Sequence, residues 1–408
     1  ADYGGAMRLR EIGLSVLAGG LLACSSDSKD DPEGALGPGG ASAAGAGGAA
    51  GAAGSGGSSA TTPNAGAGSS GASGSGSSME GVDVSGPLDT GNGGSSSAGE
   101  AGGSGGAGAG DAGAAPSDVA SVCPPGPFAA SPLPAGATPQ AVCTGMTFTE
   151  GAVWVDRLQT LFFSDFAIGD AASNFNGPIM AYTPGGECEE FIADAGTNGL
   201  AIAPDGNLLG ARHSTQTLTL FDLGTKQSSV FVADNGGLAF NSPNDIAVRS
   251  DGNIYFTDPN YMLGNRTSEQ PTRAYRRDPS GAISVIDAGA NPNGITLSPD
   301  ESRLYLSHLG GGRNDVVVFD VDPSGALGEP APFVNVGSDG MAIDCAGNLY
   351  ITQGGQVRVF SPDGEPLGQL AAPGAANVAF GGPERRTLFI TATGTLFQVE
   401  LAIPGLPY

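Results

Sequence analysis

The sequence predicts an all-β fold, a six-bladed β-propeller, and three observations support that prediction. A unit of two apolar strands joined by an Asp/Gly-type turn occurs six times between residues 150 and 392. The second strand of each copy begins 39 to 50 residues after that of the copy before it. A further apolar stretch and another turn follow each pair, so one period holds about four strands, as a propeller blade requires.

The six copies recur at regular steps along the folded part of the chain. They read EGAVWVDRLQTLFFSD (150–165), NGLAIAPDGNLLGA (198–211), NDIAVRSDGNIYFTD (244–258), NGITLSPDESRLYLS (293–307), DGMAIDCAGNLYIT (339–352) and NVAFGGPERRTLFITA (377–392). Third strands are expected at 178–182, 217–222, 273–278, 315–322, 356–364 and 395–401.

The stretch QAVCTGMTF (140–148) precedes the first copy, and the last unit is short. We therefore expect this N-terminal strand to complete the final blade and close the ring. A β-sandwich or two separate sheets would explain the even spacing poorly.

Composition divides the chain into three parts. Residues 33–117 are almost entirely Gly, Ala and Ser. A segment of that composition buries too little apolar surface to offset its ordering entropy. We expect a signal peptide at 1–24, a disordered linker at 25–120, and one propeller domain at 121–408, which is long enough for a substantial core.

The N-terminal stretch indicates export. From Met7 it reads MRLREIGLSVLAGGLLAC, a short basic region followed by a brief apolar run that ends at Cys24. The run is too short to span a bilayer comfortably, which favours a signal peptide. LLAC (21–24) resembles the lipobox of bacterial lipoproteins, so we expect a lipid anchor on Cys24 and a periplasmic or cell-surface location. The alternative is an ordinary signal peptide with an incidental cysteine.

Charge and cysteine content limit the partners. With 41 acidic and 16 basic residues, the formal net charge is −25. Such a chain repels phosphate backbones, so we expect no nucleic-acid partner, and we expect a monomer. In an exported protein, four further cysteines favour disulfides over metal thiolates. Three pairings are open for Cys123, Cys143, Cys188 and Cys345.

One polar residue stands at the head of each copy, ten or eleven positions before the second strand. Innermost strands of a propeller line its channel, so equivalent positions converge on one axis. Asp245 falls one residue out of phase, and we expect it to brace the turn or the neighbouring backbone. The six ring residues are Glu150, Asn198, Asn244, Asn293, Asp339 and Asn377.

A ring of two carboxylates and four amides offers only oxygen donors. Oxygen ligands without His or Cys suit a hard cation, and a protein-built cage favours Ca²⁺ over Mg²⁺, with another divalent cation as the alternative. Asn-Gly and Asp-Gly also form ordinary turns at strand starts. Six such residues in phase favour metal binding.

Five segments together resemble the gluconolactonase/regucalcin family, also called the senescence-marker protein family. They are EGAVW, TNGLAIAPDGNLL, NSPNDIAVRSDGNIYFTDPNY, PNGITLSPDESRLYLS and SDGMAIDCAGNLYIT, and the similarity covers about residues 143–400. The resemblance implies a six-bladed propeller with a divalent cation, usually calcium, in the channel. It implies metal ligands at Glu150, Asn244, Asn293 and Asp339, with Asn198 and Asn377 nearby either to support these ligands or to contact substrate.

The resemblance also implies hydrolysis of sugar lactones. A bound cation would polarise the lactone carbonyl, and Asp339 is our expected base for the attacking water. We further expect substrate contacts from His213, Asp258 and Tyr261, although Asp258 could equally cap a turn and His213 could be structural. His308 and Trp154 are expected to be structural.

Several departures and alternatives stay open. Relatives place an acidic residue before the histidine and paired arginines after it, whereas this chain has Arg212, Gln216 and Thr217, which puts substrate identity in doubt. The insertion 169–177 is expected to be an irregular rim loop or a lid. The same scaffold could hydrolyse another ester or a phosphorus ester, or bind a ligand without catalysis around a structural calcium. The sequence contains no GxSxG elbow, so we do not expect a covalent serine hydrolase.

Overall fold

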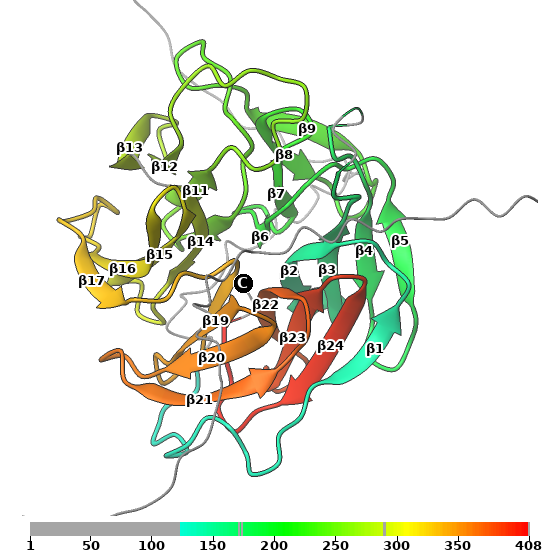
Figure 1. The fold of residues 1–408 in the computed structure, drawn as a ribbon, viewed down its shortest axis with the longest axis vertical. Helices are drawn as coiled ribbons and strands as arrows, with labels where there is room; N and C mark the ends of the chain where they lie inside the picture. Colours follow the sequence, from blue (N-terminus) through cyan, green and yellow to red (C-terminus); the bar gives the residue numbers. More distant parts are fainter. Residues whose placement is uncertain (1–122, 170–171, 173, 289–290, 407–408) are drawn as a thin grey trace, which may run out of the picture. The chain divides into compact units, whose positions relative to one another are not determined.

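The computed structural model describes residues 123–169, 172, 174–288 and 291–406, which all belong to one compact unit within Gly102–Tyr408. In this part of the chain the strands form six four-stranded antiparallel sheets, arranged like blades about a central axis (Figure 1). The predicted six-bladed propeller is confirmed. The predicted signal peptide, the linker and Cys24 lie outside the described residues.

Each blade uses four strands in sequence order from the axis outward, except the last. Blade 1 holds β2 (Thr149–Val155), β3 (Thr160–Asp165), β4 (Ile179–Tyr182) and β5 (Cys188–Ile192). Blade 2 holds β6 (Leu200–Ile202), β7 (Leu208–Arg212), β8 (Thr217–Phe221) and β9 (Ser228–Val232). Blade 3 holds β10 (Ile246–Val248), β11 (Ile254–Asp258), β12 (Arg273–Arg277) and β13 (Ile283–Ala288).

The second half of the ring repeats this plan. Blade 4 holds β14 (Pro292–Leu297), β15 (Arg303–Gly310), β16 (Arg313–Asp320) and β17 (Ala331–Val334). Blade 5 holds β18 (Met341–Ile343), β19 (Leu349–Gln353), β20 (Gln356–Phe360) and β21 (Pro366–Ala371). Blade 6 holds β22 (Ala375–Gly381), β23 (Thr387–Ala392), β24 (Thr395–Glu400) and, outermost, β1 (Gln140–Thr144).

The turns between first and second strands follow directly from their sequence. In blade 2 the backbone N–H of Gly206 donates to Ala203, and Gly206 adopts φ +81°. Asp205 accepts the N–H of Asn207 at 3.0 Å, which fixes the turn from within. A side chain at φ near +80° would be strained, so glycine is required there.

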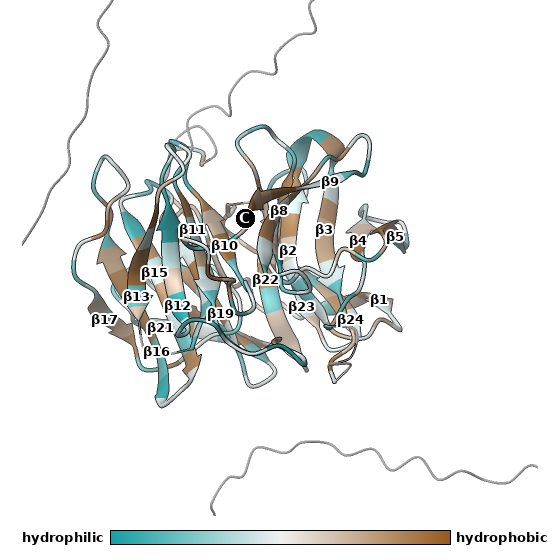
Figure 2. Ribbon diagram, turned by 90° about the horizontal axis from the view of Figure 1, so that it is seen from above, coloured by the Kyte–Doolittle hydropathy of each residue, from teal (hydrophilic) through white to brown (hydrophobic). Residues whose placement is uncertain are grey.

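Apolar side chains fill the space between adjacent blades. Along the strands hydrophobic and hydrophilic residues alternate, as Figure 2 shows by colour. Between blades 2 and 3, Phe240, Phe256 and Tyr275 pack ring against ring with centroids 5.2–5.5 Å apart. These interfaces hold each blade to the next and set the spacing of the inner strands.

The ring closes as the sequence predicted. β1 pairs antiparallel with β24, from Gln140 opposite Gln398 to Thr144 opposite Thr395. Trp154 of blade 1 is buried and stacks on Phe389 of blade 6 with centroids 5.7 Å apart, so it is a core residue, as expected. The first and last blades are thus joined by hydrogen bonds and by packing.

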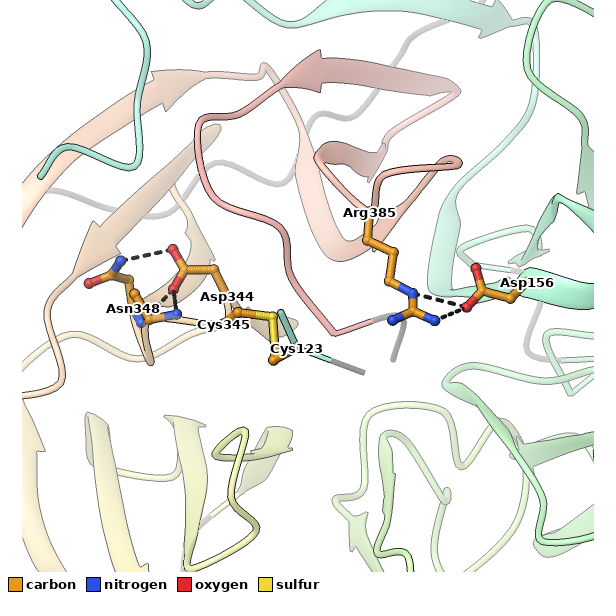
Figure 3. The surroundings of a disulfide bond; sticks show 7 residues. Cys123, Asp156, Asp344, Cys345, Asn348 and Arg385 are labelled. Carbon is orange, nitrogen blue, oxygen red and sulfur yellow. Dashed lines mark hydrogen bonds and ion pairs between the residues drawn. A yellow bond between two sulfur atoms is a disulfide. The ribbon is translucent and has the colours of Figure 1, made fainter. Parts of the chain in front are cut away.

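Two disulfides resolve the open pairing. Cys143 of β1 is bonded to Cys188 of β5, which ties the outer edges of blades 6 and 1. Cys123 is bonded to Cys345 in the first turn of blade 5, where Asp344 accepts Asn348 Nδ2 at 2.8 Å. Figure 3 shows this second disulfide beside the hydrogen-bonded Asp344 and Asn348.

The C-terminal segment crosses the same end of the molecule. Cys345 N–H donates to Pro404 at 2.8 Å, and Leu406 N–H donates to Ile343 at 3.1 Å. In Figure 3 Arg385 of blade 6 points toward Asp156 of blade 1, with Nε 2.9 Å from Oδ2. Both ends of the described chain are therefore fastened to blade 5. No helix among the described residues is long and apolar enough to cross a membrane.

Candidate active site in the central channel

The structure brings the six ring residues together. The innermost strands lie side by side in the order β2, β6, β10, β14, β18, β22 and back to β2. Five of the ring side chains are buried, whereas Asp339 is partly exposed. The phase argument from the sequence is confirmed in its placement of these residues, while their chemical roles stay predictions.

Glycines directly after several ring residues let neighbouring blades approach closely. A Cβ on Gly151 would lie 2.0 Å from the carbonyl oxygen of Asn198, in the next blade. A Cβ on Gly340 would lie 2.2 Å from Cγ of Asn377. Any side chain at these two positions would push the ring residues apart, so the glycines set the width of the ring.

Blade 3 carries Asp245 where these blades carry glycine. Its Oδ2 accepts the Ile295 N–H of blade 4 at 3.2 Å, and its Oδ1 accepts the Ile246 N–H at 3.0 Å. The expected bracing of neighbouring backbone is therefore confirmed. Asp245 is also buried, and its negative charge contributes to the electrostatics of the ring.

Behind the ring lies a set of hydroxyls that our sequence reasoning missed. Ser164 donates to the carbonyl of Asn198 at 2.7 Å, and Thr391 Oγ1 accepts the N–H of Asn377 at 3.0 Å. These hydroxyls hold the backbone of the ring residues in place. The signal was present, because each second strand has Ser or Thr three residues after its first Leu or Ile, except blade 2, which has Ala211. The set is Ser164, Thr257, Ser307, Thr352 and Thr391.

Asn293 and Asp339 make direct contact between blades 4 and 5. Asn293 Nδ2 donates to Asp339 Oδ1 at 2.9 Å. Because the amide nitrogen of Asn293 faces Asp339, the amide oxygen, Oδ1, points away from that carboxylate. That oxygen is buried and has no hydrogen-bond partner among the described residues. A buried acceptor without a partner is costly and favours a ligand that accepts its lone pairs.

Burial and the charge of Asp339 destabilise the charged forms of the channel carboxyls Glu150 and Asp245. Burial raises the pKa of Glu150 well above its usual range, and the charges of Asp339 and Asp245 add to this. Burial also raises the pKa of Asp339 to about 6. The same cause raises the pKa of Asp245 to about 7, although two backbone N–H groups oppose the shift. A cation among them would stabilise all three carboxylates.

The donor set fits a hard cation held with amide help. Within the described part of the chain, no three His, Cys, Asp or Glu side chains are grouped to hold a metal ion. A cation in the channel therefore needs amide oxygens, and Asn293 Oδ1 is one that lacks a partner. The residues that could hold calcium are Glu150, Asn244, Asn293 and Asp339.

Tyr261 lies beside this group, on the loop between β11 and β12. Its hydroxyl donates to the carbonyl of Leu309. Burial raises the pKa of Tyr261, the charge of Asp339 adds to the shift, and a hydrogen bond involving Asn293 opposes it. The phenol is therefore protonated next to Asn293 and Asp339, and its contact with substrate stays a prediction.

Asp258 lies behind the segment that leads into Asn244. Its Oδ1 accepts the Ser242 N–H at 2.8 Å and its Oδ2 accepts the Asn241 N–H at 2.9 Å. Its side chain is buried, and burial raises its pKa to about 7. In this structure Asp258 braces residues 241–242 rather than the turn leading to Pro259, and its contact with substrate stays a prediction.

Asn377 and Asn198 complete the ring on either side of Glu150. Asn377 Oδ1 accepts the Val378 N–H at 2.7 Å, and a hydrogen bond from the Asn377 side chain opposes the raised pKa of Glu150. Asn198 holds its place through its backbone, whose N–H donates to Ala211 at 2.9 Å. Their contact with substrate stays a prediction.

The two histidines are both fully buried and bond to groups outside the ring. His213 is fully buried, and its Nε2 is 2.8 Å from the carbonyl oxygen of Phe175 in the 169–177 insertion. His308 is fully buried between Asp315 and Asp287, each 3.2 Å from one ring nitrogen, in keeping with the structural role expected for it. Direct contact between His213 and a substrate would require the rim to move.

Two of the three residues that depart from the family pattern, Gln216 and Arg212, are hydrogen-bonded to backbone. Gln216 Nε2 donates to the carbonyls of Phe240 and Asn241, on the loop that leads to Asn244. Arg212 donates to the carbonyl of Asp194 at 3.1 Å. Both side chains thus serve loop structure in this chain.

A groove of about 590 Å³ lies elsewhere, between the turns of blades 1 and 6 and the two chain ends. Its lining includes Pro124, Gln159, Arg386 and Pro404 and none of the ring residues. Its charged side chains of both signs pair with one another, as in Arg385 with Asp156 and Arg386 with Glu384.

Comparison with known proteins gives one consistent result. The family model described as SMP-30/Gluconolactonase/LRE-like region matches residues 148–394. A gluconolactonase of Zymomonas mobilis is 32% identical over 287 residues, covering 64% of this chain and 80% of the relative. A pentonolactonase of Haloferax volcanii is 24% identical, covering 66% of this chain and 96% of the relative.

A solved structure extends the similarity to the fold. That of a gluconolactonase from Xanthomonas campestris matches with a TM-score of 0.60 and 29% identity, covering 71% of this chain and 98% of the other. The propeller described above is therefore similar in architecture to that gluconolactonase, at a sequence identity close to that of the Zymomonas relative.

Proposed function

The chain belongs to the SMP-30/gluconolactonase/LRE-like family, and from that premise we propose that it is a calcium-dependent lactonase acting on sugar lactones. The lactonases of Zymomonas and Haloferax support the reaction class. The observation that supports the site most directly is the buried Asn293 Oδ1, which has no partner among the described residues, on a side chain bonded to the Asp339 carboxyl.

Glu150, Asn244, Asn293 and Asp339 would hold the cation. When bound there, calcium would polarise a lactone carbonyl and stabilise the negative charge that develops on its oxygen. Asp339 is the partly exposed ring residue, so it can meet a water molecule in the channel. Asp339 takes a proton from that water as the water oxygen attacks the carbonyl carbon.

Ring opening and one proton transfer then complete the reaction. The ring C–O bond breaks, and the departing alkoxide takes up one proton, so that lactone and water become one hydroxy acid. Tyr261 is protonated, lies beside Asp339 and donates its one hydroxyl hydrogen to Leu309, so its oxygen would accept a hydrogen bond from a substrate hydroxyl. Asn198 and Asn377 flank Glu150 and would contact the hydroxyls of the sugar.

The test is hydrolysis of a substrate panel by the full chain. The panel holds glucono-δ-lactone, a pentonolactone, an aryl ester and a phosphorus ester, assayed with a chelator and then with calcium, magnesium or manganese restored. We expect chelator-sensitive turnover, restored best by calcium and fastest on the sugar lactones. Fastest turnover of an ester would assign another substrate to the same scaffold. No metal-dependent turnover on any substrate would favour a ligand-binding propeller.

We also propose that Cys24 carries a lipid anchor, on the strength of the LLAC sequence at 21–24. In a bacterial host, the full chain should incorporate labelled palmitate and fractionate with membranes. Cys24→Ser should lose both properties while retaining lactonase turnover. Equal labelling of the two proteins would contradict the anchor.

A further inference from the structure

His213 lies beneath the rim of the channel, directly after β7. It has no exposed surface, and its imidazole lies edge-on to Phe166 and Phe175, with ring centroids 4.8 Å and 6.4 Å away. A residue in this position can influence a substrate only through the rim above it.

The hydrogen bond to the rim fixes the state of the ring. A carbonyl oxygen can only accept, so Nε2, 2.8 Å from the Phe175 oxygen, carries the proton. Nδ1 is buried and has no hydrogen-bond partner among the described residues. Burial lowers the pKa of His213 to about 4, and the charges of Arg266 and Arg212 act in the same direction. His213 is thus a neutral donor near neutral pH.

The rim segment 174–177 needs such a donor because its backbone is strained. Asn174 and Phe175 adopt φ +54° and +56°, a region that an aromatic side chain rarely occupies. Conformations of this kind persist when the surroundings impose them. Here Asn176 Nδ2 also donates to Asp194 Oδ1 at 3.1 Å.

The same segment is joined to the channel ring. Gly196 N–H donates to the carbonyl of Gly177 at 2.8 Å, and Gly196 lies two residues before Asn198. Thr197 Oγ1 is 2.7 Å from Ser164 Oγ, which also donates to the Asn198 carbonyl. A continuous set of contacts therefore runs from His213 through the rim to a ring residue.

We propose that His213 is a positioning residue: its Nε2–H, donated to Phe175, holds the rim segment 174–177 beside Asn198, and the rim sets which lactone substituents the mouth admits. The part of the inference that concerns substrate selection rests on the proposed lactonase function. The part that concerns how His213 holds the rim does not. Loss of the donor should loosen substrate binding and size selection while leaving the ring that performs the chemistry in place.

The experiment compares His213→Gln with His213→Asn in the full chain. The Gln amide nitrogen reaches the position of Nε2 and keeps the donor, whereas the shorter Asn reaches only the position of Nδ1. Hydrogen–deuterium exchange should be faster by about tenfold at 174–177 in His213→Asn, the effect of one lost hydrogen bond. Exchange in His213→Gln should stay near that of the wild type.

Kinetics provide the second measurement. KM for glucono-δ-lactone should rise about five- to tenfold in His213→Asn with kcat changed less than about threefold, and the ratio of KM values for small and bulky lactones should shift toward one. His213→Gln should restore both.

Three outcomes would overturn the proposal. They are exchange at 174–177 equal to wild type in His213→Asn, equal behaviour of the two variants, and a loss of kcat with unchanged KM. If the wild type hydrolyses no lactone, the proposed function fails while the exchange measurement still tests the hold on the rim. If His213→Asn does not fold, Asn176→Ala, which removes the bond to Asp194, should raise exchange at 174–177 in the same way, and no increase would contradict the proposal.

Discussion

Asn293 donates from Nδ2 to Oδ1 of Asp339 across 2.9 Å, and this contact joins blades 4 and 5 inside the channel. It decides the orientation of the amide, because the nitrogen faces the carboxylate and the oxygen is left without a partner. It also places a hydrogen-bond donor on the residue proposed as the base. One contact thus joins the proposed metal ligand Asn293 to the proposed base Asp339.

Replacing the base should separate turnover from binding. Asp339→Asn keeps the shape of the side chain and its ability to ligate, but removes the group that takes the proton. We expect kcat for glucono-δ-lactone to fall roughly 10²–10⁴-fold, the usual contribution of a general base. Calcium binding, measured by calorimetry, should persist with reduced affinity.

The matched control is Asp363→Asn, at an exposed turn of blade 5. Its kcat should equal that of the wild type. If Asp339→Asn loses calcium and activity together, Asp339 would be a ligand without a separate role as base.

Calcium affinity should rise with pH. The pKa of Asp339 is raised to about 6 and that of Glu150 is raised as well, so protons compete with the cation in mildly acidic solution. Affinity should increase between about pH 5 and pH 7.5, and calcium binding should release protons. Calorimetry in two buffers of different ionisation enthalpy measures that release. Affinity independent of pH, without proton release, would contradict carboxylate ligation.

The stability of the metal-free protein should depend on pH with the opposite sign. Carboxyls whose pKa is raised in the folded state contribute stability at low pH that is lost as pH rises through the folded value. For Asp339 and Asp245 the window runs from about pH 4 to about pH 7. Thermal unfolding with chelator should therefore show a Tm that falls across this window relative to the calcium-bound protein.

Much of this architecture could be predicted from the sequence because propeller blades repeat locally. Two strands and a tight turn leave a pattern that survives divergence, and phase alone placed Glu150 and Asp339 on one axis. Other features depend on contacts between distant segments. The partner of Cys123 is 222 residues away, and the position of His213 is decided by Phe175, whose positive φ no propensity indicates. Ser and Thr behind the ring resemble ordinary strand residues, so their function was missed.

Ring width should be sensitive to a single methyl group. Gly340→Ala places a Cβ 2.2 Å from Cγ of Asn377, so blades 5 and 6 must separate or Asn377 must move. We expect unfolding free energy to fall by ~1–3 kcal/mol, typical of overpacking, and calcium affinity to fall as well. Gly224→Ala, at an exposed turn where the nearest atom is 3.5 Å away, is the control and should change neither. Unchanged calcium affinity in Gly340→Ala would show that the ring does not depend on this approach.

The two disulfides should stabilise the propeller without affecting its chemistry. Cys143–Cys188 closes a 45-residue separation across the junction of blades 6 and 1, and Cys123–Cys345 spans 222 residues. Loss of either cross-link frees the unfolded chain, so each double Cys→Ser variant should lose about 3–5 kcal/mol in urea unfolding. Loss of Cys123–Cys345 should destabilise the protein more, because this disulfide closes the longer loop. In addition, Cys345 holds the C-terminal segment through its hydrogen bond to Pro404. KM and kcat below the unfolding transition should stay near wild type, because neither bridge touches a ring residue. A kinetic defect in the folded Cys143→Ser/Cys188→Ser variant would instead mean that closure of the blades controls the geometry of the channel.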